Sequence, residues 1–162
     1  MSKYPVVIGR FEYIDVIDKC SNVPAKIDTG AYHSSIHADH IEEFTKNGKP
    51  TLRFTLLGHP VHKESATVET TRFTVTTVRS SNGHQVERYK IFLKIRLGYK
   101  VFSTPFTLSS RSKNVFPVLI GREALRKRYL VDAAKAGIER INLLKAARQE
   151  AMQEEEMEGV NR

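Results

Sequence analysis

The stretch Ala25-Lys26-Ile27-Asp28-Thr29-Gly30-Ala31 carries one acidic residue from an apolar segment into a Thr-Gly turn. If the apolar segment is a strand, Asp28 stands at the end of that strand, with its carboxylate near backbone N–H donors. Asp-Thr-Gly is also an ordinary turn sequence, because Asp bonds its own backbone two residues on and Gly supplies a positive φ. The tripeptide alone therefore predicts a turn, and it predicts a catalytic site only where the rest of the chain supports one.

A second apolar stretch lies far along the chain, at Val115–Ile120, and it ends in Gly121-Arg122 before a short helical pattern at Glu123–Tyr129. Between the two stretches, Asn82-Gly83 precedes the segment Val86–Ile91, a combination typical of a β-hairpin. The Asp turn, the hairpin and the Gly-Arg segment, in this order, are far more specific than the turn alone. Together they resemble the retropepsins, single-domain aspartic proteases in which a flap hairpin separates an Asp-Thr-Gly turn from an Ile-Gly-Arg strand.

The closer resemblance is to a bacterial family of retropepsin-like proteins commonly labelled "ATP-dependent zinc protease". It extends from Ile8 to Asp132, and the residues that carry it are Gly9-Arg10, Glu12, Lys26, Asp28-Thr29-Gly30-Ala31, Ser34-Ser35, His37-Ala38, Gly83-His84, Glu87-Arg88, Leu119-Ile120-Gly121-Arg122 and Val131-Asp132. That family usually continues its turn as Ala-Arg-Thr-Ser, whereas this chain reads Ala31-Tyr32-His33-Ser34. The difference concerns substrate preference and leaves the acid in place.

The chain up to Leu108 reads as short strands separated by turns, which predicts a mostly-β barrel or sandwich. The strongest signal is the segment Tyr89–Leu97, in which apolar residues alternate with Lys90, Lys94 and Arg96. The resemblance adds that these strands close into a retropepsin-like (acid protease) β-barrel, with a short helix after the Ile-Gly-Arg strand.

We expect one barrel domain over residues 1–132 and a helical extension over residues 133–162. Asp132 is a suitable N-cap for a helix from Ala133 to about Met157, whose narrow apolar stripe fades into the acidic tail around Glu154-Glu155-Glu156. This helix is expected to pack on the barrel or on a partner subunit.

The composition is that of a folded, basic protein, since 40% of its 162 residues are hydrophobic and its formal net charge is +8. The charge favours an acidic or phosphate-bearing partner. A solvated basic surface explains the charge as well, which makes nucleic acid the weaker alternative. No apolar run approaches the ~18 residues of a membrane helix, the first residues lack an apolar signal-peptide core, and Cys20 is the single cysteine. We therefore expect a cytoplasmic protein with no membrane segment and no intrachain disulfide.

An aspartic protease needs two carboxylates that share one proton, so that one accepts a proton from a water while the other donates to the scissile carbonyl. This chain has a single Asp-Thr-Gly turn, so the catalytic Asp28 is expected to meet its own symmetry mate in a C2 homodimer. By position in the family, Thr29 braces the paired loops across the axis and Gly30 lets the backbone approach the two acids. Ala31 completes this active-site loop.

Other positions that match the family complete the candidate site. The residues expected in the flap or the cleft are Asn82, Gly83, His84, Arg88 and His37. Packing or hydrogen bonding is the alternative role for the two histidines. Gly121 and Arg122 are expected to support the Asp turn, through a buried guanidinium that bonds the Asp loop or the neighbouring subunit. Direct contact with substrate is the alternative role for Arg122.

Metal chemistry is the rival that the family label invites, because the chain has six histidines. The spacing His33-x3-His37-x2-His40 could form a metal face on a helix, but on a strand His40 falls on the opposite face from the other two. The chain has no His-Glu-x-x-His, and it has no Gly-x4-Gly-Lys-Ser/Thr loop for ATP phosphates. We therefore expect neither a metal nor another cofactor.

The sequence thus predicts an aspartic endopeptidase whose two copies of Asp28 activate a water in a homodimer. The resemblance implies a peptide or protein substrate that is acidic or glutamate-tagged, because family members often occur beside ATP-grasp glutamate ligases. Two alternatives remain open. One is a non-catalytic basic β-barrel module that binds an acidic protein or RNA, and the weaker one is a zinc-dependent hydrolase.

Overall fold

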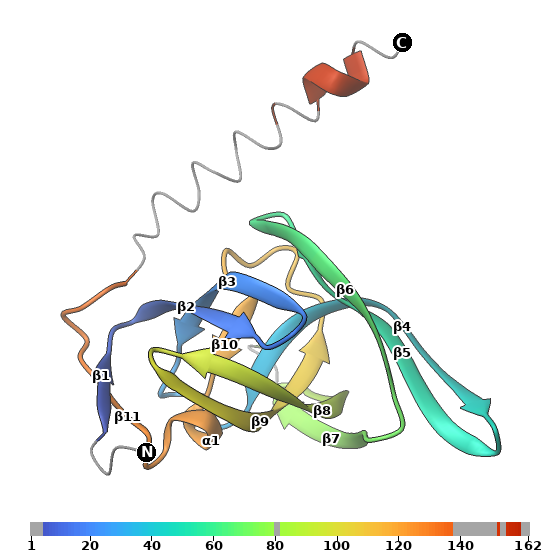
Figure 1. Cartoon of the computed structure of the whole chain (residues 1–162), viewed down its shortest axis with the longest axis horizontal. Helices are drawn as coiled ribbons and strands as arrows, with labels where there is room; N and C mark the ends of the chain where they lie inside the picture. The colour runs from blue at the N-terminus through green and yellow to red at the C-terminus, as the bar shows by residue number, and fades with distance from the viewer. Residues whose placement is uncertain (1–4, 80–81, 138–151, 153–154, 160–162) are drawn as a thin grey trace.

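The structure, a computed structural model, describes residues 5–79, 82–137, 152 and 155–159 (Figure 1). Its elements follow one another along the chain as β1 (Val6–Ile8), β2 (Phe11–Val16), β3 (Cys20–Ile27), β4 (Ser34–Lys46), β5 (Lys49–His59), β6 (His62–Thr70), β7 (Thr74–Arg79), β8 (Gln85–Leu97), β9 (Lys100–Ser109), β10 (Val118–Ile120), α1 (Arg122–Leu125) and β11 (Tyr129–Val131).

Six of these strands close into a barrel. β10, β3, β2, β8, β9 and β4 are neighbours in this order, and β4 pairs again with β10, so the ring returns to its start. Its interior is filled by buried apolar side chains from different strands, among them Ile14, Val23, Ile36, Ile95 and Phe106. The predicted mostly-β fold and closed barrel are confirmed.

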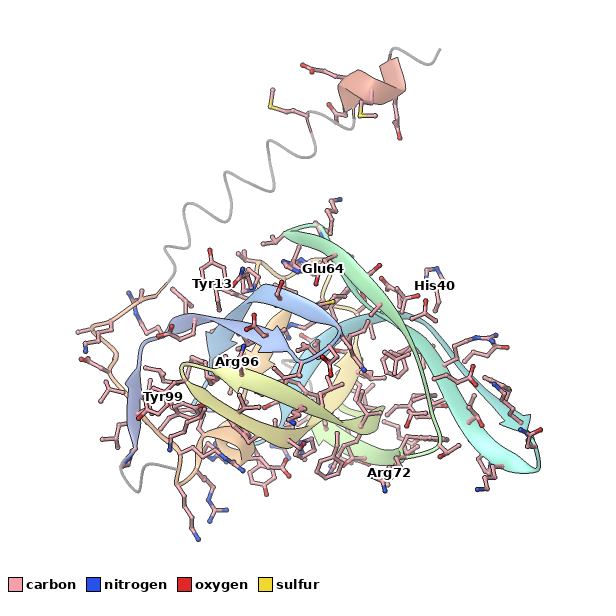
Figure 2. The ribbon with its side chains drawn as sticks, in the orientation of Figure 1. Tyr13, His40, Glu64, Arg72, Arg96 and Tyr99 are labelled. Atoms are coloured by element: carbon pink, nitrogen blue, oxygen red, sulfur yellow. The ribbon has the colours of Figure 1, made fainter. Side chains whose placement is uncertain are left out.

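β8 shows the alternation that the sequence predicts for it. Ile91, Leu93, Ile95 and Leu97 are buried, whereas Phe92, Lys94 and Arg96 are exposed. Figure 2 shows Arg96 on the outer surface, where it pairs with Asp15 of β2 at 3.2 Å. Successive side chains of a strand point to opposite faces, so one face of β8 lines the core and the other meets solvent.

The pairing of β3 with β10 positions the Asp turn. The two strands are parallel, with Ile27 beside Ile120. Because parallel strands end at the same edge of a sheet, Asp28 and Gly121, the next residues of the two strands, come together. A hydrogen bond of 2.9 Å from the Asp28 backbone N to the Ile120 carbonyl oxygen joins the two strand ends.

Two parts of the sheet lie outside the ring. β4 continues past the barrel and pairs with β5, which pairs with β6, and these strands form a projecting arm (Figure 1). A bulge between Asp39 and Glu42, where His40 has a φ of 53°, redirects β4 into this arm. β7 pairs with β8 as an antiparallel hairpin, and Gly83 in its turn has a φ of 79°, which favours glycine.

The short helix after β10 is present, but its predicted bounds at Glu123–Tyr129 are wrong. α1 covers only Arg122–Leu125, because Lys127 takes a left-handed φ of 65° and Tyr129 enters β11. The Tyr129 hydroxyl donates to the carbonyl oxygen of Leu97 at 2.7 Å, a buried bond that ties β11 to the barrel. Tertiary contacts therefore override the local helical pattern here.

The long helix predicted from Ala133 does not begin there. Asp132 Oδ1 accepts a hydrogen bond of 2.9 Å from Ala134 N, but residues 133–137 form a turn and an irregular segment without helix. This segment bonds the start of the barrel instead, since Lys135 O accepts from Arg10 N at 2.8 Å and Gly137 N donates to Phe11 O at 2.9 Å. Most of the predicted helix, and with it the predicted packing, lies outside the described residues. The residues of this region that the structure does describe beyond 137, namely 152 and 155–159, are helical. In the described part of the chain, none of the helices is long and apolar enough to cross a membrane.

Candidate active site

Asp28 is half-buried and follows directly after β3, at the start of the exposed Thr29-Gly30 turn. Its Oδ1 accepts a hydrogen bond of 2.9 Å from Gly30 N, and its carbonyl oxygen accepts one of 3.3 Å from Ala31 N. A Cβ added to Gly30 would lie 3.2 Å from Asp28 Oδ1, so a larger residue at this position would press on the carboxylate. The backbone of the turn therefore fixes the orientation of the Asp28 carboxylate.

Gly121 and Arg122 close this turn from the β10 side. Gly121 N donates to Ser34 Oγ at 3.0 Å, and a Cβ on Gly121 would come within 2.6 Å of the carbonyl oxygens of Tyr32 and His33. The backbone N of Arg122 donates to Ala31 O at 2.8 Å. The Arg122 side chain is exposed rather than buried. Its Nη1 donates one hydrogen bond of 3.0 Å to the carbonyl oxygen of Thr29. It thus bonds the Asp loop through a backbone oxygen and not through a bidentate carboxylate contact.

Asp28 faces a cleft of about 1110 Å³. With the Asp loop, it is lined by the β7–β8 hairpin through Val78, Arg79 and Arg88, by the end of β9 and by the loop of residues 110–116. Single residues of β2, β3, β4 and β10 also line it. The hairpin lies where a flap is expected. Of the sequence-predicted flap residues, Arg88 lines the cleft, whereas Asn82, Gly83 and His84 are exposed around the hairpin turn and are not among the lining residues.

His37 lies behind the cleft rather than in it. Its side chain is 1% exposed, its Nε2 bonds Asp39 Oδ2 at 2.9 Å, and its Nδ1 accepts from Arg111 N at 2.8 Å. Because Nδ1 is an acceptor, the ring proton sits on Nε2 and is donated to the carboxylate of Asp39. In this structure His37 is thus a buried, hydrogen-bonded residue, as in the alternative role considered for it, and it does not line the cleft.

Sequence reasoning missed the partner of His37, which is His59 at the end of β5. The two rings meet edge to face with centroids 5.1 Å apart. His59 Nδ1 accepts from Val61 N at 3.1 Å, so its Nε2 carries the proton and donates to the carbonyl oxygen of Arg111 at 2.7 Å. Desolvation by burial lowers the pKa of His59 below its usual value, and the hydrogen bond to the Arg111 carbonyl oxygen opposes this effect without cancelling it. No local motif marks these residues, because the bonds to Arg111 span 74 and 52 positions.

The cleft is strongly positive. Among the described residues, its lining contains one acidic residue, Asp28, and five basic ones, Lys26, Arg79, Arg88, Arg111 and Lys113. Burial lowers the pKa of the Arg111 guanidinium, and the charge of Asp28 acts in the opposite direction. Such a surface attracts anionic ligands and raises their local concentration.

The histidines of the candidate metal spacing do not converge. His33 lies 3.5 Å from Glu123 Oε2, His37 is buried against Asp39, and His40 points outward from β4 (Figure 2). Among the residues that the structure describes, no group of three His, Cys, Asp or Glu side chains could share a metal ion.

The model of the RimB-like family, described as the retropepsin-like aspartic endopeptidase RimB, matches residues 7–141. The chain belongs to this family. The match covers every strand of the RimB-like barrel, the Asp28 turn, the β7–β8 hairpin and the Gly121-Arg122 step. The resemblance read from the sequence is confirmed.

Curated relatives of this RimB-like chain carry the name "Probable alpha-L-glutamate ligase". The relative from Shewanella pealeana is 33% identical over 117 residues, which cover 70% of this chain and 25% of the relative. The one from Desulfotalea psychrophila is 33% identical over 115 residues, which cover 69% and 24% of the respective chains. The RimB-like chain therefore spans about a quarter of the length of the curated relatives it matches.

A solved structure also matches the RimB-like barrel. It is the crystal structure of a protein of unknown function from Legionella pneumophila, with a TM-score of 0.66 and 30% sequence identity. The match covers 82% of this chain and 97% of the Legionella chain.

Proposed function

We propose that the protein is an aspartic endopeptidase whose active site forms between two copies of the chain. The observation that carries this proposal is the place of Asp28, at the joined ends of β3 and β10 and facing a cleft beside a flap-like hairpin. Asp28 is the single acidic residue among those that line the cleft in the described part of the chain. A paired-carboxylate mechanism needs a second acid, and a C2 homodimer supplies it from the partner's own turn.

In that homodimer the two carboxylates share one proton, because two like charges a few ångströms apart do not both ionise at low cost. The ionised Asp28 removes a proton from a bound water, which attacks the scissile carbonyl. The protonated Asp28 of the other chain donates to the carbonyl oxygen. The hydrogen bond from Gly30 N to Asp28 Oδ1 orients the carboxylate, and exposed Thr29 stands on the face that a second loop would meet.

We further propose an acidic peptide as substrate, with a glutamate-tagged protein as the specific case. The five basic residues of the cleft support this, since they would bind successive carboxylates of such a chain. The relatives named as glutamate ligases support the glutamate tag, because this chain resembles one segment of each of them. We propose the cytoplasm as the compartment, in keeping with a sequence that has a single cysteine.

The test of the peptidase is Asp28→Asn, which keeps the shape of the side chain and removes its acid. Cleavage of a glutamate-tailed peptide should fall by about 10²–10⁴-fold, the usual contribution of a positioned acid or base. Asp18→Asn is the matched control, because Asp18 is exposed and its φ of 63° suits asparagine. Cleavage followed by mass spectrometry from acidic to neutral pH decides the matter, and undiminished turnover by Asp28→Asn would reject the proposal.

The second candidate is a basic binding module without catalysis, which the same five cleft cations favour. It predicts that the wild-type protein cleaves no acidic peptide at any pH. It also predicts tight binding of polyglutamate or RNA that weakens steeply as salt increases. The reason is that the basic side chains displace counterions from the bound polyanion, and added salt opposes this release. Fluorescence anisotropy of labelled polyglutamate and RNA over a salt series measures this binding.

A further inference from the structure

The loop between β9 and β10 carries Arg111, a half-buried arginine that lines the same cleft as Asp28. Its Nε donates to the carbonyl oxygen of Phe116 at 2.9 Å, across the loop. Within the described residues, the terminal Nη atoms of Arg111 make no hydrogen bond or ion pair. A guanidinium presents five N–H donors in a rigid fork, so most of its donors remain available to a ligand.

Two buried histidines fix the backbone of this arginine on both sides. His37 accepts the Arg111 N–H at 2.8 Å and His59 donates to the Arg111 carbonyl at 2.7 Å. The two side chains are 1% and 0% exposed. Because the loop is already held, a ligand that binds the guanidinium does not bear the full entropy cost of ordering it.

The guanidinium and the Asp28 carboxylate do not form an ion pair with each other, although both line the cleft. Their charges nevertheless interact, and the attraction of Asp28 counters the lowering of the Arg111 pKa by burial. A peptide bond positioned for attack at Asp28 would therefore place neighbouring side chains within the field of this cation.

We propose that Arg111 binds the carboxylate of an acidic substrate residue next to the bond that is cleaved at Asp28, an inference that rests on the proposed peptidase function. A carboxylate accepts two parallel bonds from the guanidinium fork. An amide of the same shape fits poorly, because its NH₂ group meets donors and can accept none of their hydrogen bonds. Arg111 is thus a specificity-determining residue that distinguishes Glu from Gln, and His37 and His59 are its positioning residues.

The test compares two peptides that differ only in Glu or Gln at the residues flanking the cleaved bond. The wild-type protein should prefer the Glu peptide in kcat/KM by about tenfold or more, the usual value of a charge-assisted hydrogen bond. Arg111→Gln should remove this preference by slowing cleavage of the Glu peptide while changing that of the Gln peptide little. Arg72→Gln is the matched control, because Arg72 is an exposed arginine in the segment between β6 and β7 (Figure 2) that does not line the cleft, and it should keep the wild-type ratio.

Arg111→Lys distinguishes loss of carboxylate binding from loss of folding. It keeps a cation at this position but loses the guanidinium fork and the hydrogen bond to the Phe116 carbonyl oxygen. It should retain a reduced preference for Glu. If Arg111→Gln keeps the wild-type ratio, or lowers both rates equally, the role of Arg111 is refuted while the peptidase stands.

A binding measurement in the Asp28→Asn background separates the inference from the catalytic proposal. Calorimetry should show tighter binding of the Glu peptide than of the Gln peptide, and Arg111→Gln should abolish the difference. Absence of cleavage by the wild-type protein together with an Arg111-dependent Glu preference would refute the peptidase alone. Equal binding of both peptides by Asp28→Asn would refute the specificity role of Arg111.

Discussion

His59 is a buried histidine whose charge state is coupled to the stability of the fold. Desolvation lowers the pKa of its imidazole below the ordinary value of 6.5, so the unfolded chain binds a proton at this residue at higher pH than the folded chain does. The stabilisation is complete above a pH of 6.5 and is lost as pH falls from there toward the lower pKa of the folded state. Protonation would also remove the Nδ1 acceptor that Val61 N uses.

We predict that His59→Gln flattens the acid side of the stability profile. Glutamine keeps an N–H donor for the Arg111 carbonyl oxygen but takes up no proton. The free energy of unfolding should therefore lose a slope of up to about 1.4 kcal/mol per pH unit below the ordinary histidine pKa. Urea unfolding at a series of pH values measures it, with the exposed His84→Gln as control. An acid slope identical to that of the wild type would contradict this account.

Single residues also show what the sequence could and could not predict about the site. Asp28 and Gly121 could be singled out from the sequence because they belong to the short motifs Asp28-Thr29-Gly30 and Ile120-Gly121-Arg122, which carry the family resemblance. Arg111 and His59 were missed because their contacts join β4, β5 and the loop after β9 in space. His37 was singled out by position, but only burial shows that it holds a loop rather than lining the cleft.

Among the elements, the step from β10 into α1 determines how the Asp turn is held. We predict that Gly121→Ala destabilises the protein by about 1–3 kcal/mol, as overpacking does, because the added Cβ would lie 2.6 Å from two carbonyl oxygens. Cleavage should fall as well, since those oxygens belong to residues that follow the Asp loop. Thermal unfolding and peptide cleavage measure the two effects. Gly159→Ala is the matched control, because its Cβ would meet no atom within 4 Å, and equal stability of the two variants would contradict the prediction.

Elements in which apolar and polar residues alternate regularly could be predicted from the sequence. Elements whose ends depend on contacts with distant residues could not. β8 alternates between buried and exposed residues from Ile91 to Leu97, because one face of this part of the strand fills the barrel. The helix predicted over Glu123–Tyr129 stops early because Tyr129 bonds Leu97 in the barrel, and the left-handed φ of Lys127 leaves no mark in the sequence. The helix predicted from Ala133 does not begin there, because the backbones of Lys135 and Gly137 form hydrogen bonds with Arg10 and Phe11 instead of helical ones.

For the whole molecule, the proposed mechanism requires that the single Asp-Thr-Gly acid of each chain meet the same acid of a second chain. The loop that carries Asp28 lies at the surface, since Thr29 and Gly30 are exposed and Tyr32 is 45% exposed. A second copy could therefore approach the turn without rearranging the barrel. Because the six strands form a closed ring, we expect two chains to associate with little change in the backbone of either barrel.

The proposed homodimer makes a quantitative prediction for mixtures of wild-type and Asp28→Asn chains. If each active site needs two intact acids and the chains pair at random, activity follows the square of the wild-type fraction. An equal mixture, allowed to exchange, should then show about one quarter of the activity of the same total amount of wild-type protein. A site complete within one chain would retain about one half, because each wild-type chain would act independently. Sedimentation velocity on the same samples establishes whether dimers are present, and Asp18→Asn in place of Asp28→Asn should leave the mixture fully active. A linear dependence on the wild-type fraction, in samples shown to contain exchanged dimers, would mean that Asp28 acts without its symmetry mate.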